Sequence, residues 1–257
     1  MEINLLALSL GNCRLAIGSF AAGQLGPVTR VPHGQRGDWA ARIRELWAPL
    51  ADEPGAAVAA ASVNPALDQP LEQAIERATG RKVLWIGKDI DLPIRVMTEE
   101  PQRTGVDRVL NIAAAHEQMG KACVVVDAGT AVTVDCCNDA GDFLGGAIAP
   151  GVSMMLDALH HGTAKLPRVD FDIPTEVFGR STREAILQGV YHGTRGLVKE
   201  SVERYATELG QWPEIIATGG DAPKLFEGWE LIHAVSPDLA MYGIALAYAD
   251  YHIKHGT

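Results

Sequence analysis

The chain has 257 residues, with 22 Lys or Arg and 32 Asp or Glu, so its formal net charge is −10. Hydrophobic residues make up 47% and charged residues 21%, which is ordinary globular composition and excludes low-complexity disorder and a fibrous protein. The length supports one large domain or two modest ones. The acidic balance argues against a nucleic-acid binder, which needs a concentrated basic surface, although a few backbone amides can still hold a phosphate.

The N-terminus and the cysteines indicate a cytoplasmic protein. No basic segment precedes the first apolar run, so no signal peptide is expected. No apolar stretch reaches the ~20 residues of a membrane span, so no membrane partner is expected. The cysteines form no CxxC pair, which favours reduced, half-buried thiols over zinc ligands. They are Cys13, Cys123, Cys136 and Cys137.

The first half of the chain alternates short apolar runs with helical patterns, which favours an α/β fold. A tight turn at residues 9–12 joins the first two expected strands. The strands are expected at residues 5–8, 14–17, 56–61 and 82–86. The helices are expected at residues 39–50, 66–78 and 108–119.

The second half opens with the same pattern of strand, small-residue turn and strand, at residues 122–134. This repetition predicts two related halves, residues 1–119 and 120–257, with the boundary near Gly120. After it come a Gly/Pro-rich stretch at 145–151, a helix at 154–159, a loop at 166–178, a helix at 182–209, a strand at 214–217 and a helix at 237–251.

Three glycines interrupt the long helix expected at residues 182–209. Gly189, Gly193 and Gly196 each cost about 1 kcal/mol of helix propensity relative to Ala. They indicate a second backbone packed close to that side of the helix, such as that of a partner subunit.

Common nucleotide and hydrolase signatures are absent, and three glycine turns at strand ends remain as candidate sites. In the turn at residues 127–130, Gly129 allows successive amides to converge and Thr130 adds a hydroxyl. Asp127 ends a buried strand, where a carboxylate is costly unless it faces a cation or a water-filled cleft. A hairpin in which Asp127 caps local amides is an equal alternative. The turns at residues 11–14 and 218–220 taken alone favour ordinary turns.

Gly105-Val106-Asp107-Arg108 precedes a helix. Asp107 is interpreted first as a helix cap, whereas Arg108 is unusual in a first turn because the helix dipole disfavours cations there. The alternative is a base and a carboxylate clamp that face a cleft. His160 and His161 are expected to diverge on a helix, so a solvated surface is favoured over a metal site.

Taken together, six motifs resemble those of type III pantothenate kinases, in the acetate and sugar kinase/Hsp70/actin superfamily. The motifs are Gly11–Arg14, Gly105–Arg108, Asp127–Ala131, Gly145–Gly151, Gly179–Thr182 and Thr218–Gly220. The resemblance implies two ribonuclease-H-like halves, each a mixed sheet flanked by helices, around a central cleft. It also implies ATP-dependent phosphorylation of pantothenate to 4'-phosphopantothenate, the first step of coenzyme A synthesis.

The resemblance further implies roles for single residues. Asp107 is expected as the general base, and pantothenate is expected to bind Gly105, Val106, Asp107, Arg108 and Thr182, at the interface of a homodimer. ATP with Mg²⁺ is expected to contact Ser9, Gly11, Asn12, Cys13, Arg14, Thr130, Gly219 and Gly220. Asp127 is expected to bind a monovalent cation, K⁺ or NH₄⁺.

The first phosphate motif departs from the family at two positions. Ser9 stands where the family has an aspartate, and Cys13 replaces a Thr or Ser. Thr98 also stands where many members have a tyrosine. Because losing one charge-stabilising group costs about 3–4 kcal/mol of barrier, two hypotheses follow. One is a working kinase that is slow or altered in metal use, and the other is a catalytically impaired or non-catalytic relative with a binding or regulatory role.

Overall fold

The computed structural model describes residues 3–255, which form two compact units. The first unit comprises the chain up to Arg95, Glu100–Ala114 and the chain from Asp238 onward. The second comprises Val96–Glu99 and Ala115–Pro237. The chain thus leaves the first unit for the short segment Val96–Glu99 and again after Ala114, and it returns to the first unit for its last helix.

A mixed six-stranded sheet forms the centre of the first unit. Its path runs β3-β2-β1-β5-β6, and β4 also pairs with β2. The central strand β1 is antiparallel to β2 and parallel to β5. The strands are β1 (Leu5–Leu10), β2 (Arg14–Ala21), β3 (Gln24–Leu25), β4 (Thr29–Pro32), β5 (Ala57–Ser62) and β6 (Val83–Trp85).

Helices cover both faces of this sheet, because the side chains of β1 alternate between two apolar cores. Leu6 and Leu8 pack in a core with Ile43 of α1, whereas Leu5 and Ala7 pack in a core with residues of α3 and α7. The helices are α1 (Trp39–Trp47), α2 (Asp68–Thr79), α3 (Val106–Met119) and α7 (Leu239–His255). Short 3₁₀ turns are η1 (His33–Asp38), η2 (Ala48–Leu50), η3 (Pro65–Leu67) and η4 (Pro101–Arg103).

The second unit repeats the strand order of the first. Its five-stranded sheet runs β11-β10-β7-β8-β9, with β7 antiparallel to β8 and parallel to β10. In each unit the first strand therefore lies between the strand that follows it and a later, parallel strand: β1 lies between β2 and β5, and β7 lies between β8 and β10. The strands are β7 (Cys123–Ala128), β8 (Ala131–Cys137), β9 (Phe143–Pro150), β10 (Glu214–Thr218) and β11 (Ala234–Val235). This architecture confirms the predicted α/β fold with two mixed sheets flanked by helices.

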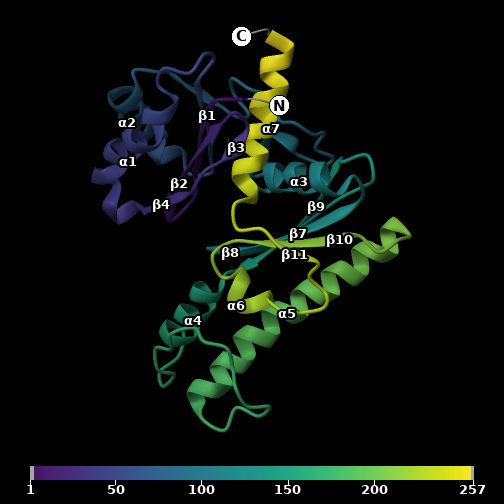
Figure 1. The fold of residues 1–257 in the computed structure, drawn as a ribbon. Helices are drawn as coiled ribbons and strands as arrows, with labels where there is room; N and C mark the ends of the chain where they lie inside the picture. Colours follow the sequence, from purple (N-terminus) through teal and green to yellow (C-terminus); the bar gives the residue numbers. More distant parts are fainter. Residues whose placement is uncertain (1–2, 256–257) are drawn as a thin grey trace. The chain divides into compact units, whose positions relative to one another are not determined.

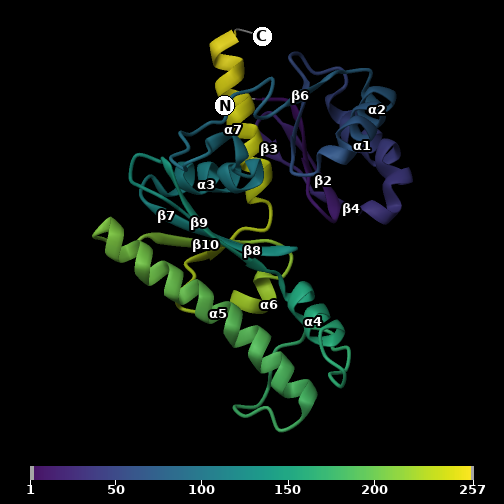
Figure 2. The ribbon, with the colours of Figure 1, turned by 180° about the vertical axis from the view of Figure 1, so that it is seen from behind.

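One core of the second unit lies between its sheet and three helices, α4 (Val152–His161), α5 (Thr182–Leu209) and α6 (Ala222–Phe226). Figures 1 and 2 show α5 running from the loop after α4 along one face of the sheet. The bounds of α5 match the prediction. No helix in residues 3–255 is long and apolar enough to span a membrane.

The Gly/Pro-rich stretch at residues 145–151, where the sequence predicts no strand, has regular structure. Most of that segment is strand β9. A Cβ atom at Gly146 would lie 2.2 Å from Asp135 Oδ1 and 2.3 Å from the carbonyl oxygen of Val134 on the neighbouring strand. Glycine is therefore required there by a close strand partner, and it does not break the strand.

Three smaller expectations are also wrong. Ser9 and Leu10 belong to β1, so the first turn begins at Gly11. The rings of His160 and His161 do not diverge, since their centroids are 4.9 Å apart. Cys13 is exposed and the other three thiols are buried, so half-buried is not correct for the cysteines, although none of the four forms a disulfide.

Candidate active site

The first predicted phosphate-binding segment is the turn that joins β1 to β2. Ser9 is half-buried near the end of β1, and the turn is closed by the N–H of Gly11, which donates to the carbonyl of Arg14 at 3.1 Å. Asn12, Cys13 and Arg14 are exposed. The turn lies at the carboxyl end of β1, next to that of its parallel neighbour β5. In sheets of this kind, ligands bind beyond the carboxyl ends of the strands.

Ser9 and Asp127 hold equivalent positions in the two units. Each is the fifth residue of a six-residue first strand and stands two residues before a turn glycine. Each also pairs in register with the parallel neighbour of its strand, Ser9 with Ala61 of β5 and Asp127 with Thr218 of β10. The carboxylate present in the second unit is therefore missing from the matching point of the first.

In the second unit, the turns at Gly129–Thr130, Gly151 and Gly219–Gly220 crowd around the end of β7. Gly219 has φ +95°, and a Cβ atom on it would lie 2.5 Å from Asp127 Oδ1. The N–H of Gly151 donates to the carbonyl of Thr130 at 3.1 Å. Asp127 is half-buried, whereas Thr130 and Gly220 are exposed. The structure thus brings Asp127, Thr130 and the Gly219 turn together at one edge of the sheet.

Asp107 lies inside the first turn of α3, which corrects its interpretation as the residue before the helix. The helix begins at Val106, and the Oδ1 of Asp107 accepts a hydrogen bond from the N–H of Arg108 at 2.8 Å. A Cβ atom at Gly105 would lie 2.7 Å from that oxygen, so only glycine leaves room for this rotamer.

Burial raises the pKa of Asp107 above the ordinary value of an aspartate. The hydrogen bond from the backbone of Arg108 and the charge of Arg108 act in the opposite direction, and burial dominates. Val106 and Arg108 are half-buried beside it. A partly desolvated carboxylate with a raised pKa at a helix start has the properties of a general base.

Thr182 stands apart from the strand-end turns. It is exposed in the first turn of α5, after Ser181, whose hydroxyl caps the helix by accepting from the N–H of Glu184 at 3.1 Å. Figures 1 and 2 show that this end of α5 points away from the sheet of the second unit. Within that unit, Thr182 is not brought to Asp127.

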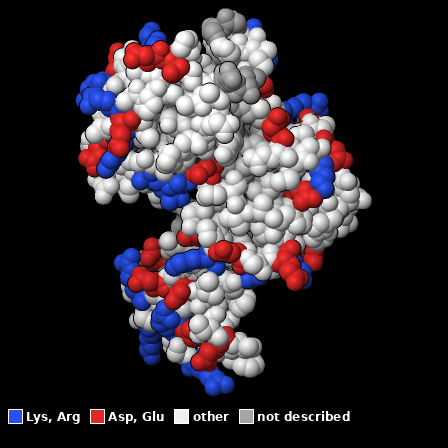
Figure 3. All heavy atoms as spheres, viewed as in Figure 1, with Lys and Arg blue, Asp and Glu red and all other residues white. Residues whose placement is uncertain are grey.

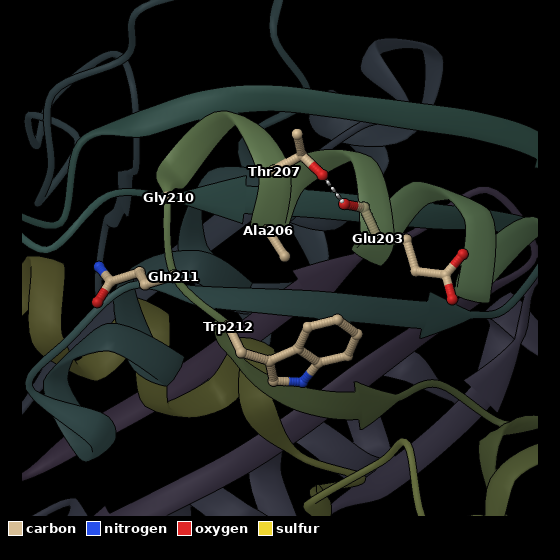
Figure 4. A pocket seen from close by; sticks show the side chains of 6 residues that line it. All are labelled: Glu203, Ala206, Thr207, Gly210, Gln211 and Trp212. Atoms are coloured by element: carbon tan, nitrogen blue, oxygen red, sulfur yellow. Dashed lines mark hydrogen bonds between the residues drawn. The ribbon is translucent and has the colours of Figure 1, made fainter.

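Surface hollows of the second unit lie elsewhere. One of about 400 Å³ adjoins the end of α5, where the indole of Trp212 lies beside the last turns of the helix (Figure 4). A second of about 560 Å³ shares Trp212 and is also lined by Lys199, Trp229 and His233. Neither contains a predicted site residue. On the face drawn in Figure 3, acidic and basic side chains are interspersed over the described residues.

Comparison with known proteins decides the family. A sequence model of type III pantothenate kinase matches residues 5–204. The chain is 33% identical over 253 residues to a type III pantothenate kinase of Solibacter usitatus, covering 96% of this chain and 97% of that protein. It is 36% identical over 249 residues to one of Anaeromyxobacter sp. strain K, covering 95% and 98%. The chain belongs to the type III pantothenate kinase family.

Two solved structures share the fold of this chain. A Baf family protein from Campylobacter jejuni has a TM-score of 0.64 at 18% identity, covering 96% of this chain and 98% of that one. Component A of (R)-2-hydroxyglutaryl-CoA dehydratase from Acidaminococcus fermentans has a TM-score of 0.55 at 14% identity, also covering 96% and 98%. At such identities, these structures support the fold and nothing finer.

Gly151 and Asp221 support the turn after β7, yet the sequence predicts no role for them. Gly151 approaches so closely that a Cβ atom would lie 2.3 Å from the carbonyl oxygen of Gly129. The N–H of Asp221 donates to the carbonyl of Ala128 at 3.0 Å. Gly151 could have been found from its place at the end of the motif Gly145–Gly151. The bond of Asp221 uses its backbone N–H, so the residue type does not reveal it.

Proposed function

We propose that this protein transfers the γ-phosphoryl group of ATP to the primary hydroxyl of pantothenate, forming 4'-phosphopantothenate in the first step of coenzyme A synthesis. The observation that carries the proposal is Asp107, held in the first turn of α3 with a raised pKa. In this role Asp107 accepts the hydroxyl proton, and Gly105, Val106 and Arg108 hold pantothenate. Phosphoryl transfer requires positioning and charge neutralisation more than covalent catalysis, which suits a site with one such base.

The residues at the strand ends fit a nucleotide. ATP with Mg²⁺ supplies the phosphoryl group and neutralises part of its charge. Gly11 and Gly129 close the turns after β1 and β7 by donating their N–H groups to the carbonyls of Arg14 and Ala131. The proposed nucleotide contacts beside these glycines are the N–H groups of Asn12 and Gly219 and the hydroxyl of Thr130. Few Lys or Arg side chains flank these turns, so amides and cations carry most of the neutralisation. Ser9, Cys13, Arg14 and Gly220 complete the proposed nucleotide contacts.

Asp127 is the proposed ligand of a monovalent cation, K⁺ or NH₄⁺. Its carboxylate is half-buried and close to the backbone of Gly219, where its negative charge favours a bound cation. A cation there would also lower the negative potential that nucleotide phosphates meet on approach.

A homodimer is proposed from the second unit. Gly189, Gly193 and Gly196 share one face of α5, and a Cβ atom on any of them would meet no atom within 4 Å. No backbone among residues 3–255 therefore packs on these glycines. We infer that the backbone of a partner subunit packs there. The loop before α5 also exposes Val177 by 86% and Phe178 by 72%. Thr182, beside this loop, is then placed to complete the pantothenate site at the interface.

The direct test is an assay of purified protein with pantothenate, ATP, Mg²⁺ and K⁺, in which 4'-phosphopantothenate is identified by mass. Turnover that is lost in Asp107→Asn supports the proposal. No product at high protein concentration contradicts it.

A second candidate is a catalytically impaired or non-catalytic relative with a binding or regulatory role. The observation that favours it is Ser9, which is neutral where its counterpart in the second unit is Asp127. Its neighbours across the sheet are Ala16 and Ala61, so a larger side chain at Ser9 displaces no bulky group. Calorimetry with ADP that shows nucleotide binding without turnover supports this candidate.

Ser9→Asp separates the two candidates. If the missing charge is what limits turnover, Ser9→Asp raises kcat by about 10²–10³ and the uncharged Ser9→Asn does not. A wild-type enzyme that is already fast and gains nothing from Ser9→Asp excludes the impaired relative.

A further inference from the structure

His33 contacts two carbonyl groups of the turn between β1 and β2. The residue begins η1, directly after β4, about twenty residues beyond the turn. Its backbone N–H donates to the carbonyl of Cys13 at 3.0 Å, and its ring Nε2 lies 2.9 Å from the carbonyl oxygen of Gly11. A carbonyl oxygen only accepts, so Nε2 carries the ring proton and donates it.

The ring of His33 is held in one orientation by packing, and one of its two nitrogen atoms makes no hydrogen bond. It meets the ring of Trp39 edge-on, at 5.8 Å between centroids and 72° between planes. Trp39 is only 2% exposed, so it is a rigid support. The Nδ1 of His33 is buried and has no hydrogen-bond partner among residues 3–255. The ring therefore serves the turn through Nε2 alone.

The two carbonyls fix the direction of two amides. The described chain has no cis peptide bonds, and in a trans peptide unit the C=O and the following N–H point in opposite directions. With the carbonyls of Gly11 and Cys13 directed at His33, the N–H groups of Asn12 and Arg14 point away from it. Amides turned the same way from one short turn form a backbone site for an anion.

We propose that His33 is a positioning residue for nucleotide phosphates, holding the turn at Gly11–Arg14 so that its amides face the ligand. The inference rests on the proposed nucleotide-dependent function and assigns it a residue that does not itself touch the nucleotide. It predicts that the Nε2 donor matters, whereas the aromatic ring and the Nδ1 atom do not.

Two substitutions of His33 distinguish the role of Nε2 from that of Nδ1. Gln places an amide nitrogen near the position of Nε2, whereas Asn places one near Nδ1 and cannot reach the carbonyl of Gly11. His33→Asn is expected to raise the KM for ATP about tenfold, the effect of one buried hydrogen bond, with the KM for pantothenate within about twofold. His33→Gln is expected to stay within about threefold of wild type on both. His255→Asn, an exposed histidine of the same unit, is the matched control.

The same variants are titrated with Mg²⁺-ADP by calorimetry, which needs no turnover. Weaker ADP binding in His33→Asn with rescue in His33→Gln supports the proposal. Equal loss in both variants, a parallel rise in the KM for pantothenate, or no loss in either overturns it. If wild type binds ADP without phosphorylating pantothenate, the kinase proposal fails while the ADP titration still decides on His33. A wild-type protein that binds no ADP contradicts both.

Discussion

Gly219 and Asp127 are in such close contact that a Cβ atom on the glycine would lie 2.5 Å from Oδ1 of the aspartate and 2.4 Å from the carbonyl oxygen of Ala128. Gly219 also has φ +95°, a backbone conformation that side chains strongly disfavour. The turn after β10 therefore determines where the Asp127 carboxylate can lie, although 92 residues separate the two in the chain.

Gly219→Ala is expected to lower the free energy of unfolding by about 2 kcal/mol or more, since strain and overpacking add at this position. Displacing Asp127 is also expected to weaken the dependence of activity on K⁺. Chemical denaturation and a K⁺ titration of activity measure the two effects. A variant that is as stable as wild type and responds normally to K⁺ excludes this role of Gly219.

Asp107→Asn is expected to reduce kcat by about 10²–10⁴, because the amide cannot accept the hydroxyl proton. In wild type, activity rises with pH as Asp107 loses its proton, and its raised pKa places this limb above the range of an ordinary aspartate. A pH profile of kcat/KM checks this. A limb at the ordinary pKa of an aspartate contradicts it.

Asp107→Asn is expected to raise the stability of the protein, although it lowers kcat. Because the folded pKa is raised, the charged form of Asp107 is disfavoured by folding, so stability falls as pH rises through this pKa. Asp107→Asn therefore melts at a higher Tm than wild type at neutral pH, and the gain vanishes at acid pH. Asp52→Asn, at an exposed position of the same unit, serves as the control and is expected to melt like wild type.

Alanine at Gly193 tests the homodimer. A methyl group there meets no other side chain or element of residues 3–255 within 4 Å, and in a monomer it raises helix stability by up to about 1 kcal/mol. In the proposed dimer it overpacks the interface, so dimerisation is expected to weaken by about 1–3 kcal/mol. Sedimentation of wild type and Gly193→Ala gives the dissociation constants. A monomeric wild type, or a variant that only gains stability, contradicts the dimer proposal.

Selective alkylation tests the turn after β1. Cys13 is exposed, whereas burial raises the pKa of the Cys136 thiol to about 12, and the hydrogen bond with Cys137 together with burial raises that of Cys123. Iodoacetamide is therefore expected to modify Cys13 first, and Mg²⁺-ATP to slow this reaction several-fold. Peptide mass mapping locates the adduct, and Cys13→Ser is the control. Protection by pantothenate alone would contradict nucleotide binding at this turn.

Much of the fold follows from local pattern. β1 and β7 are apolar runs that end at a small-residue turn, so the repeat of the two units is visible in the sequence. The bounds of α5 were predictable because Ser181 caps its start and Gly210, with φ +70°, ends it. Strand β9 was not predicted, because glycines such as Gly145 and Gly146 disfavour a strand when only neighbours in sequence are considered. Their reason lies in Asp135 on the adjacent strand.

The candidate site was predictable at its turns but not in its supports. Gly11 and Gly129 stand at strand ends, where sequence alone indicates a tight turn. His33 gave no signal, because its partners Gly11 and Cys13 are backbone groups about twenty residues away. Asp107 was interpreted as a cap because sequence does not fix the first helical residue within one position. Its burial comes from tertiary packing.

Because helix α7 is at the end of the chain, the two units have all their residues at different stages of synthesis. The second unit has its last strand once residue 235 has been made. The first unit has its last strand by residue 85, yet one face of its sheet is covered in part by Met241, Ile244 and Tyr248 of α7. Gly243 lets that helix approach the carbonyl of Leu110 closely. On the ribosome, the half of the protein that is made first is thus the last to be completed.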